Sequence, residues 1–110
     1  MSRLVKLSAR NFQEEVLESD VPVLVEFSAS WCLPSRQQEP VLQQIAREFD
    51  GKLKVADLNV DRNPAPASRY RVMGCPTFVV FQAGEEVVRR TGAQSRARLL
   101  EMVQAVVNVD

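Results

Sequence analysis

Two cysteines and the acidic side chains are the groups of this 110-residue chain that could carry covalent or acid–base chemistry. Because the sequence contains no histidine, it excludes Ser-His-Asp and Cys-His catalysis and any zinc site built on histidine. Two cysteines alone cannot complete a four-thiolate zinc cage or staple a scaffold with several disulfides. The chemistry must therefore fall on Cys32, on Cys75, on a carboxylate or on a bound ligand.

Cys32 lies between a predicted buried strand and a predicted helix. Residues 21–29 form a nearly continuous apolar run, which is typical of a central strand buried on both faces. Apolar residues then recur at the spacing of one helix face over residues 34–49, and Pro34 suits a first helical turn. The free backbone N–H groups and the dipole of that helix would favour a thiolate, which is the nucleophilic form. We therefore interpret Cys32 as a reactive thiol.

The rest of the chain continues this alternation of strands and helices. A short N-terminal helix is expected after an edge strand at residues 4–7, and Asn11 and Glu14 have the spacing of a capping box for it. Further expected elements are strands at 53–60, 78–81 and 86–91, a short helix at 67–70, and a last helix capped by Ser95. The pattern predicts an α/β fold with a mixed sheet and helices on both faces.

Residues 31–35, Trp-Cys-Leu-Pro-Ser, resemble the thioredoxin active-site motif Trp-Cys-X-Pro-Cys, with Ser35 in place of the second cysteine. The resemblance extends over nearly the whole chain through Glu26, Pro40, Asp61, Asn63 and Pro64, Gly74 to Thr77, Gly84 and Gly92. It implies a single thioredoxin domain over residues 1–110, with a central mixed five-stranded sheet flanked by helices on both faces. It also implies thiol–disulfide exchange with Cys32 as the nucleophile, and a cis peptide bond before Pro76.

Ser35 changes the second half of the reaction that this resemblance implies. In the family, the first cysteine forms a mixed disulfide with a substrate and the second cysteine resolves it, which a serine hydroxyl cannot do. Ser35 can still donate a hydrogen bond to the Cys32 thiolate. Three explanations stay open: a natural monothiol protein, an engineered replacement of the resolving cysteine, or a Cys75 that has become the resolving thiol. Cys75 can equally be a small apolar residue of the loop before Pro76.

Glu26 interrupts the apolar run of residues 21–29, and burial there would raise the pKa of its carboxyl. The family uses an acid at this position in proton transfer at the active site. For Glu26, a proton buffer for Cys32 and a structural remnant both stay open. Asp57 stands where many thioredoxins have a lysine near the buried acid. If the two carboxyls approach each other, each disfavours the ionisation of the other.

The resemblance implies a surface around Cys32 that docks an extended segment of a partner protein. The residues expected to form its rim are Trp31, Leu33, Pro34, Met73, Gly74, Pro76, Gly92 and Ala93. The expected partners are protein disulfides and, as reductant, a thioredoxin-reductase-type donor or a low-molecular-weight thiol, without a metal or cofactor. Two alternatives are a redox-inactive binding or chaperone module of the same fold, and a dimer that binds an iron–sulfur cluster through Cys32 and Cys75.

Charge and hydropathy limit which other classes of partner this chain is expected to have. Fourteen basic and fourteen acidic residues give a formal net charge of zero, which does not support binding to a phosphate backbone. No apolar run approaches the roughly 20 residues that span a bilayer, and the first residues lack the apolar core of a signal peptide. We therefore expect a cytoplasmic monomer that binds neither nucleic acid nor membrane, unless a leader has been removed.

Overall fold

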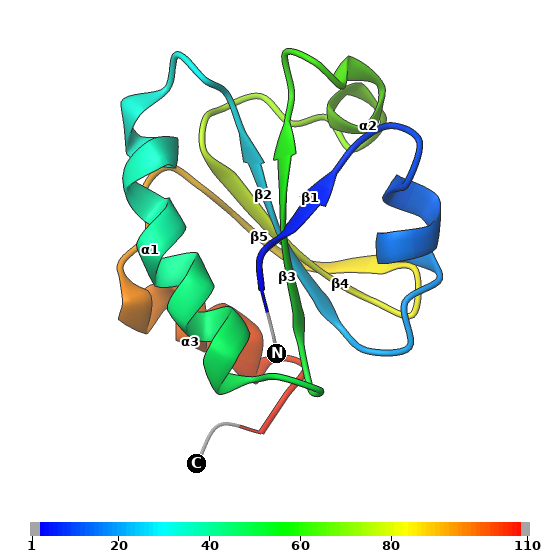
Figure 1. Cartoon of the computed structure of the whole chain (residues 1–110), viewed down its shortest axis with the longest axis vertical. Coiled ribbons are helices and arrows are strands. Elements are labelled where there is room, and N and C mark those ends of the chain that lie inside the picture. Colours follow the sequence, from blue (N-terminus) through cyan, green and yellow to red (C-terminus); the bar gives the residue numbers. More distant parts are fainter. Residues whose placement is uncertain (1–2, 109–110) are drawn as a thin grey trace.

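A mixed sheet forms the centre of the computed structural model, which describes residues 3–108 (Figure 1). Its five strands are β1 (Val5–Leu7), β2 (Val23–Ser28), β3 (Lys54–Asn59), β4 (Thr77–Gln82) and β5 (Glu85–Thr91). They lie in the order β1-β3-β2-β4-β5, in which β1, β3 and β2 are parallel and β4 runs antiparallel to both of its neighbours. The mixed five-stranded sheet expected from the sequence is thus confirmed.

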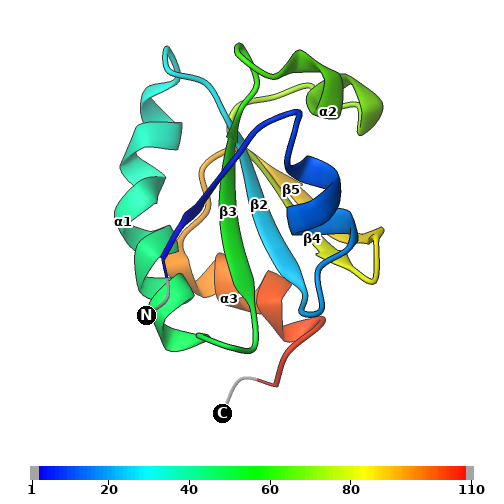
Figure 2. The same ribbon diagram turned by 45° about the vertical axis from the view of Figure 1, so that its right-hand side comes forward.

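Helices cover both faces of this sheet (Figure 2). One face carries α1 (Leu33–Glu48) and α3 (Arg96–Gln104), and the other carries the π-helix η1 (Gln13–Leu17) and α2 (Pro64–Arg69). Two apolar cores result, and β2 contributes to both because successive side chains of a strand point to opposite faces. This explains the nearly continuous apolar run predicted as a central strand. Within residues 3–108, no helix is long and apolar enough to cross a membrane.

The short N-terminal helix differs from its prediction. It is a π-helix at Gln13–Leu17, and its N-cap residue Phe12 makes no capping hydrogen bond through its side chain. The Asn11–Glu14 capping box is therefore wrong. The Asn11 side chain turns back instead, and its Oδ1 accepts a hydrogen bond of 2.7 Å from the backbone N–H of Ser8. Asn11 thus closes the turn after β1, because a local backbone donor competes for the same side chain.

The pairing of β2 with β4 decides which loops meet at the edge of the sheet where α1 begins. Phe27 near the end of β2 is the register partner of Thr77 at the start of β4. The residues just after β2 and those just before β4 therefore lie at the same edge. Thr91 at the end of β5 pairs with Thr77, so β5 also ends at this edge. Three segments that are distant in sequence are brought together there.

Candidate active site

The structure places Cys32 at the N-cap position of α1, as the sequence predicts. Its side chain is only 6% exposed, whereas Trp31 before it and Leu33 after it are largely exposed. Burial acts against ionisation of the Cys32 thiol, but hydrogen bonds from Cys75 and Ser35 outweigh it and lower its pKa. The site therefore favours a thiolate at Cys32, and the thiolate is the nucleophilic form of a cysteine in disulfide exchange.

Cys75 lies beside this thiol, although 43 positions separate the two cysteines in the sequence. It belongs to the loop before β4, where the Cys75–Pro76 peptide bond is cis, as the family resemblance implies. The Cys75 Sγ lies 3.0 Å from the Oγ of Ser35, a buried residue in the first turn of α1. Burial, together with the hydrogen bond to Cys32, raises the pKa of the Cys75 thiol to about 11. Both cysteines are free thiols, and Cys75 holds its proton while Cys32 is the more acidic of the two.

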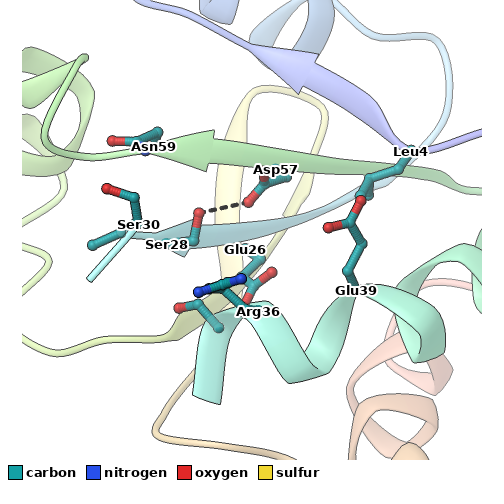
Figure 3. Close-up of a pocket in the computed structure, with 10 residues that line it drawn as sticks. Leu4, Glu26, Ser28, Ser30, Arg36, Glu39, Asp57 and Asn59 are labelled. Atoms are coloured by element: carbon teal, nitrogen blue, oxygen red, sulfur yellow. Dashed lines mark hydrogen bonds between the residues drawn. The ribbon is translucent and has the colours of Figure 1, made fainter. Parts of the chain in front are cut away.

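A cavity of about 160 Å³ lies behind Ser35, between α1 and the strands β2 and β3 (Figure 3). Glu26 lines it from β2 and is 2% exposed, and its Oε2 has no hydrogen-bond partner in the part of the chain that the structure describes. Burial, reinforced by the negative charges of Asp57 and Cys32, raises the pKa of Glu26 to about 8. Glu26 is therefore a buried acid that can gain or lose a proton near neutral pH.

A second carboxyl lies close to Glu26 in the structure. Asp57 is the register partner of Glu26 on β3, and it lines the same cavity. Its carboxylate accepts hydrogen bonds from the Ser28 hydroxyl at 2.7 Å and from the Lys6 ammonium at 3.2 Å. Lys6 also lies 3.8 Å from Glu39 of α1. The ammonium of β1 therefore partly offsets the negative charge around Glu26, and it acts to lower the pKa of that acid.

The predicted rim residues come from the three segments that meet at this edge of the sheet. Trp31, Leu33 and Pro34 are exposed at the start of α1, and Met73 is 93% exposed in the loop before β4. Between them lies a hollow of about 140 Å³, lined by Trp31, Val60, Val72, Met73, Gly74 and Cys75. The third segment is joined to the loop before β4 by a hydrogen bond of 2.7 Å from the Gly92 N–H to the carbonyl of the buried Pro76. Ala93, which follows, is exposed.

Two polar residues that hold these loops, Gln38 and Thr77, were given no role in the sequence analysis. The buried Gln38 of α1 accepts a hydrogen bond of 2.6 Å at its Oε1 from the backbone N–H of Gln94, just after Gly92 and Ala93. Thr77 donates from its Oγ1 to the Gly74 carbonyl at 2.7 Å. Gln38 could have been found, because it stands three residues after Ser35 and four before Leu42 on the buried face of the helix. A polar residue at such a position needs a partner.

Gly74 is required where β5 passes close to the loop before β4. A Cβ atom at this position would lie 2.5 Å from the Cγ2 of Thr91. We expect Gly74→Ala to lower the free energy of unfolding by about 1–2 kcal/mol, because one of the two side chains must move. Urea denaturation measures this loss. Thr91→Ser removes the opposing methyl, so the double variant should recover most of it, and a Gly74→Ala variant as stable as the parent would contradict the contact.

The sequence of this chain is similar to those of several known proteins. The sequence model of the thioredoxin family matches residues 3–105. Thioredoxin 1 of Nostoc sp. is 40% identical over 104 residues, which cover 94% of this chain and 97% of that protein. Thioredoxin of Synechocystis sp. is 39% identical over 104 residues, with the same shares of both chains. Thioredoxin of Pseudomonas aeruginosa is 38% identical over 102 residues, covering 93% and 94%.

Proposed function

Since this chain belongs to the thioredoxin family of thiol–disulfide oxidoreductases, we propose that it reduces disulfides in partner proteins with Cys32 as nucleophile and Cys75 as resolving thiol. One observation carries the proposal: the Cys75 Sγ lies 3.0 Å from Ser35 Oγ in the first turn of the helix that Cys32 caps, close enough to Cys32 to lower its pKa. A thiol so close to the nucleophile is placed to attack a disulfide formed there. Ser35 stands where the resembled motif has its second cysteine, and it cannot do so.

The two cysteines divide the reaction between them. The Cys32 thiolate attacks one sulfur of a partner disulfide, forms a mixed disulfide and releases the other sulfur as a thiolate. Cys75 then attacks the Cys32 sulfur, which forms the Cys32–Cys75 bond and releases the second partner sulfur. The partner gains two electrons, and the oxidised protein must be reduced by an external thiol or a reductase-type donor. The more acidic Cys32 suits the first step, and the more basic Cys75 keeps its proton until the second.

The exposed apolar surface beside the thiols supports docking of a partner segment. Trp31 and Met73 are 70% and 93% exposed, and both line the hollow that Cys75 also lines. Apolar side chains so exposed next to a reactive thiol fit a recognition role. We propose the rim residues Trp31, Leu33, Pro34, Met73, Gly74, Pro76, Gly92 and Ala93 as the surface that binds the partner's chain.

A thiol count tests the pairing of the cysteines. After oxidation by excess oxidised glutathione, the purified protein is denatured in acid and its free thiols are titrated. We expect no free thiol and a monomer whose mass has fallen by two hydrogens, since Cys32 and Cys75 have formed a disulfide. The Cys75→Ser variant is the matched control, because it keeps a hydrogen-bonding group at residue 75. It should retain Cys32 as an adduct or as an intermolecular disulfide.

Two results would contradict the proposal. Two persistent thiols, or an oxidised dimer linked through Cys32 in the unsubstituted protein, would mean that Cys75 does not resolve Cys32. Insulin reduction by dithiothreitol separates turnover from mere binding. We expect the protein to accelerate it, whereas the redox-inactive binding module considered from the sequence would not.

A further inference from the structure

Ser35 lies between two hollows that face different parts of the site. It lines the cavity of about 160 Å³ together with Glu26, Ser28 and Asp57. Cys75 lines the hollow of about 140 Å³ with Trp31 and Met73. The contact of 3.0 Å between Ser35 Oγ and Cys75 Sγ joins the resolving thiol to the cavity that holds the buried acid. A hydroxyl can accept one proton while it donates another, so this position suits proton transfer.

We propose that the Ser35 hydroxyl relays the proton of Cys75 to Glu26 when Cys75 resolves the mixed disulfide. This inference rests on the proposed function, because it assigns a proton path to the resolving step. Cys75 needs such a path because its pKa, raised to about 11 chiefly by burial, leaves little thiolate at neutral pH. Glu26 is the matching acceptor, since its buried Oε2 has no hydrogen-bond partner among the described residues.

Formation of the mixed disulfide makes Ser35 the better hydrogen-bond acceptor for the Cys75 thiol. In the reduced protein, Cys75 provides a hydrogen bond to Cys32. In the mixed disulfide, the Cys32 sulfur is bonded to the partner and carries no charge, so it attracts the Cys75 proton less. Ser35 Oγ is then the acceptor within hydrogen-bond distance of Cys75 Sγ. The cavity behind Ser35 has room for water that can complete the path to Glu26, since it is polar and several water volumes in size.

The step balances in atoms and electrons. The Cys75 S–H proton passes to Ser35 Oγ, and the Ser35 hydroxyl proton passes through cavity water to the Glu26 carboxylate. The Cys75 thiolate forms the bond to the Cys32 sulfur, and the bond between Cys32 and the partner breaks. The partner sulfur leaves with the electron pair and takes a proton from solvent, so Ser35 ends unchanged and Glu26 ends protonated.

The charges around Glu26 set the direction of the pH dependence. Asp57 faces it from β3 and Glu39 and Cys32 from α1, and all three raise its pKa, whereas Lys6 from β1 lowers it. Arg36 of α1 lines the same cavity. With burial as the largest cause, the pKa of Glu26 is raised to about 8 in the reduced protein. Loss of the Cys32 charge in the mixed disulfide lowers that pKa. The rate of resolution should therefore rise with pH as Glu26 ionises, with a midpoint at or below about pH 8.

The resolving step can be followed alone with a coloured leaving group. The symmetrical disulfide of 5-thio-2-nitrobenzoate reacts with the reduced protein, which releases one coloured thiolate as the mixed disulfide at Cys32 forms. Release of the second thiolate reports the attack by Cys75. The comparison uses the unsubstituted protein, Ser35→Ala, Ser35→Thr, which keeps a hydroxyl, and Glu26→Gln. Mass spectrometry confirms the Cys32–Cys75 disulfide as the product in each.

We expect Ser35→Ala and Glu26→Gln each to slow the release at neutral pH by about 100-fold, which is the lower range of general acid–base catalysis. In the unsubstituted protein, the rate should level off above the midpoint, where Glu26 is ionised. In both variants this plateau should be absent, and the rate should rise in proportion to the hydroxide concentration. Ser35→Thr should recover much of the rate. The double variant Ser35→Ala with Glu26→Gln should be no slower than either single variant, because both remove the same path.

The outcomes separate the relay from the function on which it rests. If Ser35→Ala releases the thiolate at the parent rate and with the parent pH profile, the relay is wrong while Cys75 still resolves Cys32. Additive losses in the double variant would also overturn the relay. If the unsubstituted protein keeps its adduct, as the Cys75→Ser control should, then Cys75 does not resolve Cys32, and the proposed function fails together with the relay.

Discussion

Acceleration of insulin reduction over the rate with dithiothreitol alone is expected to be lost in a Cys32→Ser variant, because the nucleophile that forms the mixed disulfide is lost. Cys75 cannot replace it. Burial is the largest cause of the raised pKa of its thiol and remains in this variant, so Cys75 stays largely protonated at neutral pH. The rate of insulin precipitation in the presence of dithiothreitol measures this loss.

The Cys75→Ser variant is the matched control for this prediction. It should still form one covalent adduct per chain with a small disulfide, because Cys32 and Ser35 remain in place. The pKa of Cys32 should stay lowered in this variant, because a serine hydroxyl is at least as good a hydrogen-bond donor as the Cys75 thiol, and alkylation rates across pH report that pKa. If Cys32→Ser kept most of the insulin activity while Cys75→Ser lost it, the assignment of the two roles would be reversed.

Glu26→Gln is expected to change how stability depends on pH. Burial, with Asp57 and Cys32, raises the pKa of Glu26 from about 4.5 to about 8 in the folded chain. Between these values the folded state keeps a proton that the unfolded state has lost, so the free energy of unfolding falls as pH rises. A pKa difference of this size contributes about 4–5 kcal/mol to the free energy of unfolding. This contribution is fully present below the pKa of Glu26 in the unfolded chain, and it is lost as the pH rises through the pKa in the folded chain. The free energy of unfolding of Glu26→Gln should not show this fall with rising pH.

Urea denaturation at several pH values between 4.5 and 9 tests this expectation. The parent and Glu26→Gln should have similar stability at the acid end, and the variant should be the more stable one at the alkaline end. Asp57→Asn is the matched control, since it removes the neighbouring carboxylate but leaves Glu26 buried. The fall in its free energy of unfolding should end at a lower pH than in the parent, because Asp57 no longer raises the pKa of Glu26. Parallel curves for parent and Glu26→Gln would contradict the raised pKa.

The sequence predicts the central part of this fold because burial and periodicity leave a strong local signal there. The apolar run at residues 21–29 contains β2 at Val23–Ser28, and the helix expected at residues 34–49 is α1 at Leu33–Glu48. The first short helix was predicted less well. Its Asn11 can bond either to the helix start or to the preceding turn, and only the folded chain decides between them.

The candidate site was predictable in its parts but not in its contacts. The family resemblance named Cys32, Ser35, Glu26 and Cys75, and the position of Asp57 indicated a second carboxyl near the buried acid. No sequence pattern gives the direction in which the Cys75 side chain points, because that direction depends on how β2 and β4 pair. The roles of Lys6 and Gln38 depend in the same way on contacts between distant elements. Such contacts require the three-dimensional structure.

The distance in sequence between the two adjacent thiols has a consequence for chain entropy. A disulfide between residues 32 and 75 closes a loop of about 44 residues, whereas a disulfide within a Cys-X-X-Cys motif closes about four. In the chain-entropy account, the larger loop restricts the unfolded chain by about 4 kcal/mol and the smaller one by about 2 kcal/mol. By this measure, oxidation through Cys75 would fasten the loop before β4 to α1 and stabilise the whole fold. Whatever reduces the protein would then work against folding energy as well as against the sulfur–sulfur bond.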